Sequence, residues 1–187
     1  MGRWEPDAQG RLVRAALELY AERGYEQTTV QDIAERAGVT ERTYFRYFAD
    51  KREVLFDGAH TLERLAVAGV ADAPPDAGPL EAAGAGVVRG CDALADRFRH
   101  ARTRAGVVAA NPGLQERELL KMAALGAALA GALRDRGVPA PAAALAAEAA
   151  VAAFRVGFES WVASDGGRGL DDHVRAALAD LRALASG

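Results

Sequence analysis

The sequence predicts an all-α protein of about nine helices, three short ones first and longer ones after them. Sustained alternating runs of β-branched and aromatic residues, which are typical of strands, are nearly absent. Apolar residues instead recur three and four positions apart along most of the chain. Stretches rich in Gly and Pro at residues 73–79, 109–113 and 137–141 separate these helical segments.

The composition narrows the possible classes of protein. Half of the 187 residues are apolar, which is enough for a sizeable core, and the net charge is only −3. Cys91 is the single cysteine, so no internal disulfide can form. We expect no membrane-spanning run and see no apolar signal region at the N-terminus, which predicts a soluble, cytoplasmic protein without a membrane partner.

The first helix is expected over residues 11–23, where Leu12, Ala15, Ala16, Leu19 and Tyr20 form an apolar stripe. Gly24 suits the left-handed position after a helix. Thr29 then caps a second helix, with Asp32 three residues on as a short capping box, and Gly38 ends that helix.

Thr40 caps a third helix, and Asp50 a fourth that is expected to run to residue 72. Two short helices joined by a Gly-containing turn are typical of a helix-turn-helix, whose second helix enters the DNA major groove. The later helices are expected at residues 80–102, 114–136, 142–163 and 171–185.

The third helix, residues 41–48, interleaves aromatic and cationic residues. Tyr44 and Phe48 lie four apart and can form a buried stripe, while Arg42, Thr43, Arg46 and Tyr47 fall largely on the other side. Arginine can pair with guanine, and a tyrosine hydroxyl can reach a phosphate. The overall charge of this region does not itself support DNA binding, since the first 58 residues hold nine Arg and Lys against eleven Asp and Glu.

Other interpretations of these residues stay open. Tyr47 can also be a core residue with a solvated hydroxyl, although Tyr44 and Phe48 already fill the inner stripe. Arg42 and Arg46 can form an ordinary solvated face, and Lys51 can be simply exposed. Glu41 would repel a phosphate, but it can accept a hydrogen bond from cytosine or point to solvent.

The stretch "TTVQDIAERAGVTERTYFRYFADKREVL" resembles the N-terminal domain of the TetR family of bacterial transcriptional regulators. The resemblance covers about residues 11–57. The matching positions are Thr28, Thr29, Val30, Asp32, Ile33, Ala34, Ala37, Gly38, Val39, Thr40, Thr43, Phe45, Tyr47, Phe48, Lys51 and Leu55. It implies a DNA-binding domain at residues 1–50 and a ligand-binding and dimerisation domain at residues 51–187.

The resemblance also implies which residues contact double-stranded operator DNA. Phe45 stands where Tyr is commoner in the family, so it would touch the backbone only by packing, and Lys51 matches the family's phosphate-binding lysine. The expected DNA-binding residues are Thr29, Gln31, Thr40, Arg42, Thr43, Phe45, Arg46, Tyr47 and Lys51.

A homodimer is implied as well, with residues 142–163 and 171–185 forming a four-helix interface. Phe158, Val174, Leu178 and Leu181 are the candidate contacts, although core residues of a monomer would show the same pattern.

The family further implies a pocket for a small-molecule effector that shifts the fourth helix. The wall of this pocket would be largely apolar, which favours a hydrophobic ligand. Each candidate residue is more often an ordinary core residue than a ligand contact. A regulator without ligand response stays an alternative. The candidates are Phe56, His60, Cys91, Leu94, Phe98, Val107, Met122, Phe154 and Trp161.

An enzyme is the main rival class. His60, His100 and His173 lie on unrelated segments, and the sequence has no metal-ligand spacing, nucleophile elbow or phosphate loop. The glycines of "AGAGVVRG" follow no strand, so they do not indicate a dinucleotide cofactor. We therefore expect no catalytic residue, metal or cofactor. The sequence predicts a dimeric repressor released by a small molecule, with a helical interaction protein as the other alternative.

Overall fold

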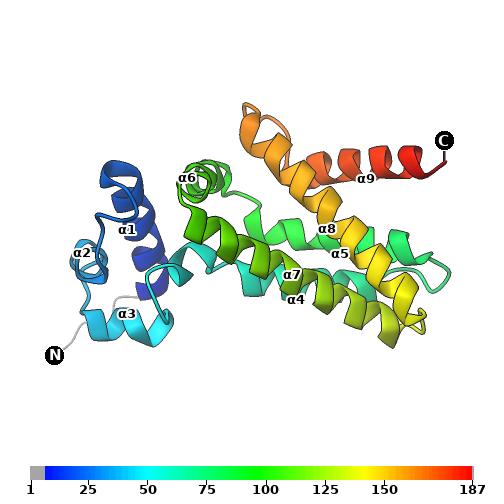
Figure 1. Cartoon of the computed structure of the whole chain (residues 1–187), viewed down its shortest axis with the longest axis horizontal. Coiled ribbons are helices and arrows are strands. Elements are labelled where there is room, and N and C mark those ends of the chain that lie inside the picture. The colour runs from blue at the N-terminus through cyan, green and yellow to red at the C-terminus, as the bar shows by residue number, and fades with distance from the viewer. Residues whose placement is uncertain (1–6, 187) are drawn as a thin grey trace. The chain divides into compact units, whose positions relative to one another are not determined.

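The computed structural model describes residues 7–186, and these contain nine α-helices, two 3₁₀-helices and no strand. The predicted all-α class is confirmed. The chain forms two compact units (Figure 1). Unit 1 comprises Met1–Asp57 and Arg102–Glu118, and unit 2 comprises Gly58–Ala101 and Leu119–Gly187. Unit 1 thus extends past the division expected at residue 50 and takes in a later segment of the chain.

Unit 1 is built around the apolar face of its first helix. Leu12, Ala16, Leu19 and Tyr20 are buried there, at the spacing expected of an amphipathic helix. The elements of this unit are α1 (Ala8–Arg23), α2 (Val30–Arg36), α3 (Glu41–Tyr47), the 3₁₀-helix η1 (Glu53–Phe56), and adjoining parts of α6 (Phe98–Ala109) and α7 (Pro112–Asp135).

The predicted caps of the short helices are confirmed. Thr29 and Asp32 form a reciprocal capping box at the start of α2. The Thr40 hydroxyl accepts the N–H of Thr43 at 3.2 Å and caps α3. Gly24 and Gly38 have φ values of 90° and 68°, the left-handed conformation that L-residues avoid. Sequence-local chemistry therefore fixes where these helices begin and end.

Two predicted helices are each broken, so the expected continuous helices over residues 51–72 and 80–102 are wrong. Asp50 caps η1 rather than a long helix, since its carboxylate accepts the N–H groups of Arg52 and Glu53 at 2.7 and 3.2 Å. After a break, α4 (Ala59–Ala71) begins, while α5 (Pro79–Gly90) and the 3₁₀-helix η2 (Cys91–Leu94) precede α6. Gly58 and Gly90 at these breaks are poor helix formers.

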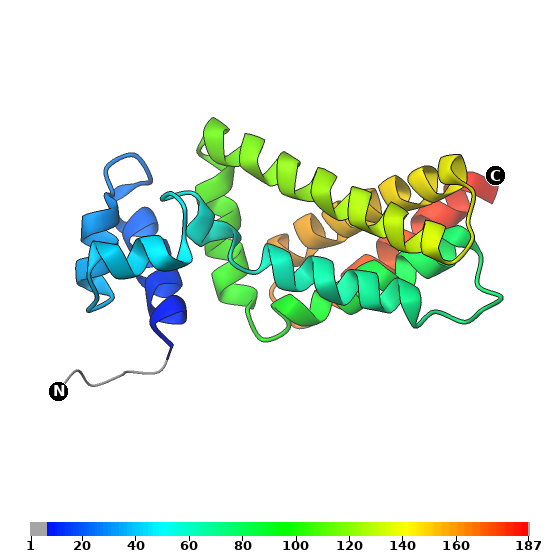
Figure 2. The same cartoon turned by 90° about the horizontal axis from the view of Figure 1, so that it is seen from below.

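Unit 2 contains the larger core, which draws on α4, α5, α7, α8 (Ala140–Ala163) and α9 (Leu170–Ser186). Helix α4 packs along α5, and α8 packs against both α5 and α9 (Figure 2). Arg136 closes one end of the unit, because its guanidinium donates to the carbonyls of Val70, Ala73 and Pro74 at the end of α4. These carbonyls would otherwise lack a helical partner.

Glycines allow the helices of unit 2 to cross closely. A Cβ on Gly86 of α5 would lie 2.7 Å from Val70 and 2.8 Å from the Ala66 carbonyl oxygen of α4. A Cβ on Gly69 of α4 would lie 2.9 Å from the Gly86 Cα. Gly157 of α8 meets the Val174 backbone of α9 in the same way, at 2.7 Å. The glycine-rich stretch at residues 83–90 therefore serves helix packing.

One helix of residues 7–186, α8, is long and apolar enough to cross a membrane by length and composition. This corrects the expectation that no segment reaches that length. The core helix of a soluble protein can meet the same criterion, and α8 buries Ala147, Val151, Phe154 and Trp161 within unit 2.

Replacing Gly86 with Ala should destabilise unit 2. The added methyl group meets backbone atoms that cannot move aside, so we expect a loss of about 1–2 kcal/mol, in spite of the better helix propensity of Ala. Gly106→Ala in α6 is the matched control, because its Cβ would meet nothing within 4 Å. That control should gain up to about 1 kcal/mol. Denaturant unfolding of both variants measures the difference, and equal stability would contradict the crossing.

Candidate nucleic-acid interface

Helix α3 separates its aromatic side chains into a buried and an exposed set. Tyr44 is fully buried, and its ring centroid lies 5.4 Å from that of the buried Phe48. Phe45 and Tyr47 are instead 53% and 38% exposed. The inner stripe of Tyr44 and Phe48 is as predicted, and the exposure of Tyr47 rules out its interpretation as a core residue. Helix α3 therefore exposes two large aromatic side chains, while its inner stripe is packed.

Arg46 and Tyr47 form a pair on the exposed side of α3. The Arg46 guanidinium lies 4.9 Å from the centre of the Tyr47 ring and donates to the Tyr47 hydroxyl at 3.1 Å. An exposed cation–π contact is worth about 0.5–1 kcal/mol, enough to bias both rotamers. The pair presents a cation and a hydroxyl together, and Arg42 adds a second exposed cation on the same helix.

The remaining polar candidates lie near the starts of α2 and α3. Thr29 and Thr40 are exposed N-caps, and the Thr40 hydroxyl lies 3.1 Å from that of Thr43. Gln31 is exposed, with its side-chain amide donating to Glu35 at 2.9 Å. All four are positioned by capping or by one-turn contacts within short helices.

Lys51 differs from the other candidates, because its ammonium group makes contacts inside unit 1. The Nζ atom donates to the carbonyls of Tyr25 and Thr28 at 3.0 and 3.3 Å and lies 4.1 Å from the centre of the Tyr25 ring. The possibility that Lys51 is simply exposed is therefore wrong. Its expected contact with a phosphate would require the ammonium group to leave or share these partners.

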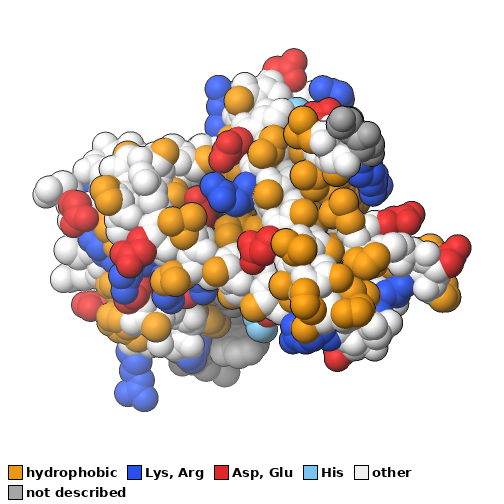
Figure 3. Space-filling view, turned by 45° about the vertical axis from the view of Figure 1, so that its right-hand side comes forward, with side chains coloured by type: hydrophobic (Ala, Val, Ile, Leu, Met, Phe, Trp, Pro, Cys, Tyr) orange, Lys and Arg blue, Asp and Glu red, His pale blue; other side chains and the backbone are white. Residues whose placement is uncertain are grey.

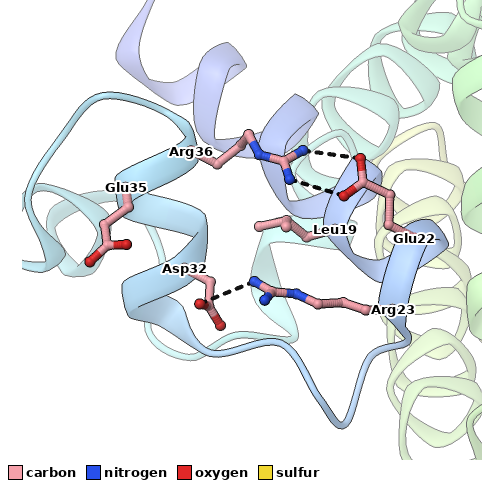
Figure 4. Close-up of a pocket in the computed structure, with 6 residues that line it drawn as sticks. All are labelled: Leu19, Glu22, Arg23, Asp32, Glu35 and Arg36. Atoms are coloured by element: carbon pink, nitrogen blue, oxygen red, sulfur yellow. Dashed lines mark hydrogen bonds and ion pairs between the residues drawn. The ribbon is translucent and has the colours of Figure 1, made fainter.

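A charged groove of about 250 Å³ lies between α1 and α2 (Figure 4). The Arg36 guanidinium makes two hydrogen bonds to the Glu22 carboxylate, at 3.1 and 2.9 Å, and Arg23 pairs with Asp32 at 3.1 Å. The hydrogen bonds from Thr29, followed by the nearby Arg23, lower the pKa of Asp32 below its usual range. These ion pairs join the two helices, and their charge makes the groove unsuited to an apolar ligand.

The segment after α3 is held by the ends of α6 and α7 that belong to unit 1. Arg104 donates to the Leu55 carbonyl at 2.6 Å, pairs with Glu118 at 2.8 Å and lies over the Phe56 ring. Arg117 of α7 pairs with Glu53 of η1. Sequence reasoning missed these two arginines, because no local pattern marks a cation whose partner in η1 lies 49 or 64 residues away.

The effector candidates divide between the two units. Cys91, Phe154 and Trp161 are buried in the core of unit 2, and Leu94, Phe98 and Met122 pack against that core. Phe98, Trp161, Phe158 and Phe154 form a chain of ring contacts with centroid distances of 5.3–6.3 Å. Phe56 and Val107 instead belong to unit 1, and His60 is exposed on α4.

Cys91 has the environment of a packing residue. It is buried, and its thiol donates to the Val87 carbonyl. Burial raises the pKa of the Cys91 thiol to about 12, so little reactive thiolate forms near neutral pH.

The dimer candidates differ in how much surface they leave to a partner. Val174 and Leu178 are buried within the chain itself, and Phe158 and Leu181 are half-buried. The large apolar side chains that α8 and α9 do expose are Leu145, Val156 and Leu184. Hydrophobic side chains gather where these helices come forward in the space-filling view (Figure 3). Sequence spacing could not separate these outer residues from the inner ones, because both sides of α8 are apolar.

Two family models match the chain. The model of the bacterial regulatory proteins of the tetR family matches residues 12–57, and the MftR C-terminal domain matches residues 77–185, more than half of the chain. The chain belongs to the TetR family. This confirms the resemblance that the short helices indicate.

Curated relatives match only part of the chain. The HTH-type transcriptional regulator TcmR of Streptomyces glaucescens is 42% identical over 72 residues, which are 38% of this chain and 32% of TcmR. The match thus spans about a third of that relative.

Solved structures share the fold over nearly the whole chain. The SmeT–triclosan complex has a TM-score of 0.64 and 19% identity, and covers 95% of this chain and 90% of SmeT. Thermus thermophilus FadR in complex with lauroyl-CoA has a TM-score of 0.53 and 24% identity, with 93% of each chain covered. At these identities the likeness concerns the fold alone.

The capping carboxylate of α2 should make unit 1 less stable in acid. Because the folded-state pKa of Asp32 lies below the unfolded value, its contribution is complete above about pH 5 and is lost as the pH falls below about 4. Thermal unfolding of Asp32→Asn and the wild type should differ at pH 7, and the difference should shrink as the pH falls below about 4. Glu26→Gln, which removes an exposed carboxylate, is the control. A constant difference between Asp32→Asn and wild type across this range would contradict the assignment.

Proposed function

We propose that the protein is a cytoplasmic transcriptional regulator that binds a palindromic operator as a homodimer and is released by a small, largely apolar ligand. The observation that carries the proposal is the exposed face of the capped helix α3. The inner side of this helix is fully packed, and the exposed side chains are Arg42, Phe45, Arg46 and Tyr47. Membership of the TetR family supports the same function.

The α3 residues have separate proposed tasks. Arg42 and Thr43, at the start of the helix, meet base edges, since the first residues of a recognition helix reach deepest into the major groove. Arg46 and Tyr47 act as a pair on base or phosphate, and Phe45 packs on sugar. Thr29, at the start of α2, lies close to a phosphate, and Gln31 on the same helix reaches a base. Thr40 meets the DNA at the start of α3. The positive charge that would attract DNA comes from the arginines of α3. Such a local concentration of charge is possible even though the net charge of the protein is −3.

The dimer is proposed to form through the outer faces of α8 and α9. Leu145, Val156 and Leu184 are large apolar side chains that a monomer leaves exposed. Two-fold symmetry would bury the same patch of both copies and would place two α3 helices on half-sites about one DNA turn apart. Phe158 and Leu181 would contribute at the edge of this surface.

The effector is proposed to bind along the aromatic contacts of unit 2, from Phe98 to Phe154. A wall of this kind favours a hydrophobic or aromatic molecule. Relatives of the same fold are known in complex with lauroyl-CoA and with triclosan, which supports an apolar ligand class. A conformational change caused by the bound effector would reach α3 through the parts of α6 and α7 in unit 1. There, Arg104 and Arg117 contact the segment that contains η1. A regulator without ligand response is the alternative.

The first experiment measures binding of the purified protein to the intergenic DNA beside its own gene at several salt concentrations. Arg46→Gln should weaken binding and lower the slope of log K against log salt by about 0.9 for each protomer, because one phosphate contact is lost. Arg134→Gln, an exposed arginine on α7, is the matched control. If neither that DNA nor a genomic fragment pool binds at low salt after removal of bound effector, the proposed function is wrong.

Replacing Val156 with Arg should dissociate the dimer. A buried, unpaired guanidinium at the centre of an apolar interface should raise the dimer dissociation constant at least about tenfold. Ala123→Arg, on an exposed position of α7, should leave the assembly unchanged. Analytical ultracentrifugation distinguishes the two, and a Val156→Arg protein that stays dimeric would exclude this face as the interface.

A further inference from the structure

The turn between α2 and α3 has a fixed internal shape. Gly38 has a φ of 68°, and its N–H donates to the Glu35 carbonyl at 3.0 Å. The Val39 N–H donates to the Ala34 carbonyl at 2.9 Å. Together these bonds form a Schellman motif, a common way of ending a helix. The motif sets how the chain turns, but it does not set how the turn lies against the rest of unit 1.

Arg11 of α1 binds this turn from outside. Its Nε–H group donates at 3.1 Å to the carbonyl of Ala37, the residue directly before Gly38. Ala37 is a buried residue, and a carbonyl in such a place is costly to leave without a donor. Leu12, the neighbour of Arg11, is fully buried and anchors this part of α1 in the core of unit 1. An anchored helix therefore holds the turn through a single donor group.

The ion pairs that join α1 to α2 lie at the protein surface. Arg36 pairs with Glu22 at 2.9 Å (Figure 4). Arg23 pairs with Asp32 at 3.1 Å. These side chains are 29–55% exposed, and exposed ion pairs contribute little to stability because water and salt weaken them. Arg11 is half-buried, so its bond to the turn is better shielded than these pairs.

The position of the turn is passed on directly to α3. Thr40, two residues after Gly38, is already the N-cap of that helix, so only a short connection separates the turn from the recognition helix. Functional groups that must meet a ligand tolerate a misplacement of only about 10–20°. A small rotation of the turn would therefore misdirect the residues at the start of α3.

We infer that Arg11 is a positioning residue for DNA recognition: its bond to the Ala37 carbonyl fixes the α2–α3 turn against α1, and so fixes the direction in which α3 presents Arg42 and Thr43. The inference rests on the proposed DNA binding. Arg11 acts here through its Nε–H group as a hydrogen-bond donor, and its charge is not required for this role.

Two substitutions of equal length separate the hydrogen bond from the charge. Gln places an amide N–H where arginine has Nε–H, whereas Met has the same length and no donor, and both are uncharged. Arg11→Met should weaken binding to the intergenic DNA beside the gene roughly tenfold, because a buried carbonyl loses its donor. Arg11→Gln should stay within about threefold of the wild type. For a phosphate ligand, the two variants should be equally weak.

Binding to a random-sequence duplex of the same length gives a second readout. Such binding depends on phosphate charge rather than on base edges, so it does not require the correct direction of α3. Arg11→Met should therefore bind the random duplex as Arg14→Met does, a variant that removes an exposed arginine of the same helix. The slope of log K against log salt should also agree between these two variants. Loss of a phosphate contact would lower this slope by about 0.9 for each protomer.

The experiment measures binding to both duplexes by the full-length wild type, Arg11→Met, Arg11→Gln and Arg14→Met, at temperatures where circular dichroism shows each to be folded. Weak intergenic binding by Arg11→Met, recovery in Arg11→Gln and equal binding of the random duplex support the inference. If Arg11→Met is unfolded, Arg11→Ala replaces it, since it removes the donor and favours the helix. Equal intergenic affinities of the Met (or Ala) and Gln variants, or a parallel loss on both duplexes, overturn the inference while leaving the proposed function intact. A wild type that binds no DNA overturns both.

Discussion

The DNA-binding face depends on the burial of one aromatic side chain, Tyr44. Helices α2 and α3 have seven residues each, well below the length at which an isolated helix is stable in water. Their conformation must come from caps and from packing. Thr40 caps α3, and Tyr44 supplies its packing, because the Tyr44 ring is fully buried against Phe48. The Tyr44 hydroxyl also reaches the Asp50 carbonyl, just beyond the helix. With the inner side of α3 occupied in this way, Phe45 and Tyr47 are left in solvent.

Features that depend on neighbouring residues could be predicted from the sequence. The caps Thr29 and Thr40, the left-handed Gly24 and Gly38, and the split between Tyr44 and its exposed neighbours all follow from spacing over a few positions. The breaks near Gly58 and Gly90 could not, since the apolar spacing continues through them. The inward course of Lys51 could not either, because its partners in the α1–α2 turn are more than twenty residues away.

A domain boundary placed at the end of the DNA-binding motif leaves out later residues that contact the motif. Unit 1 is not continuous in sequence, because residues 102–118 return to it after unit 2 has begun. Their contribution is ionic and specific: Arg104 binds the Leu55 carbonyl and Glu118, and Arg117 binds Glu53. The matched motif ends at residue 57, yet η1 at its end is held by these two arginines. A fragment cut after the motif would lack both.

The crossing of α4 and α5 has a mechanical consequence. Elsewhere in a helical bundle, side chains separate neighbouring helices and can change rotamer when one helix slides past the other. At Gly69 and Gly86 the two backbones are in close contact, and no side chain separates them. Rolling or sliding α4 alone would drive Val70 and Ala66 into the α5 backbone. The two helices are therefore locked together at this crossing, so we expect α4 and α5 to move as one body rather than to slide past each other.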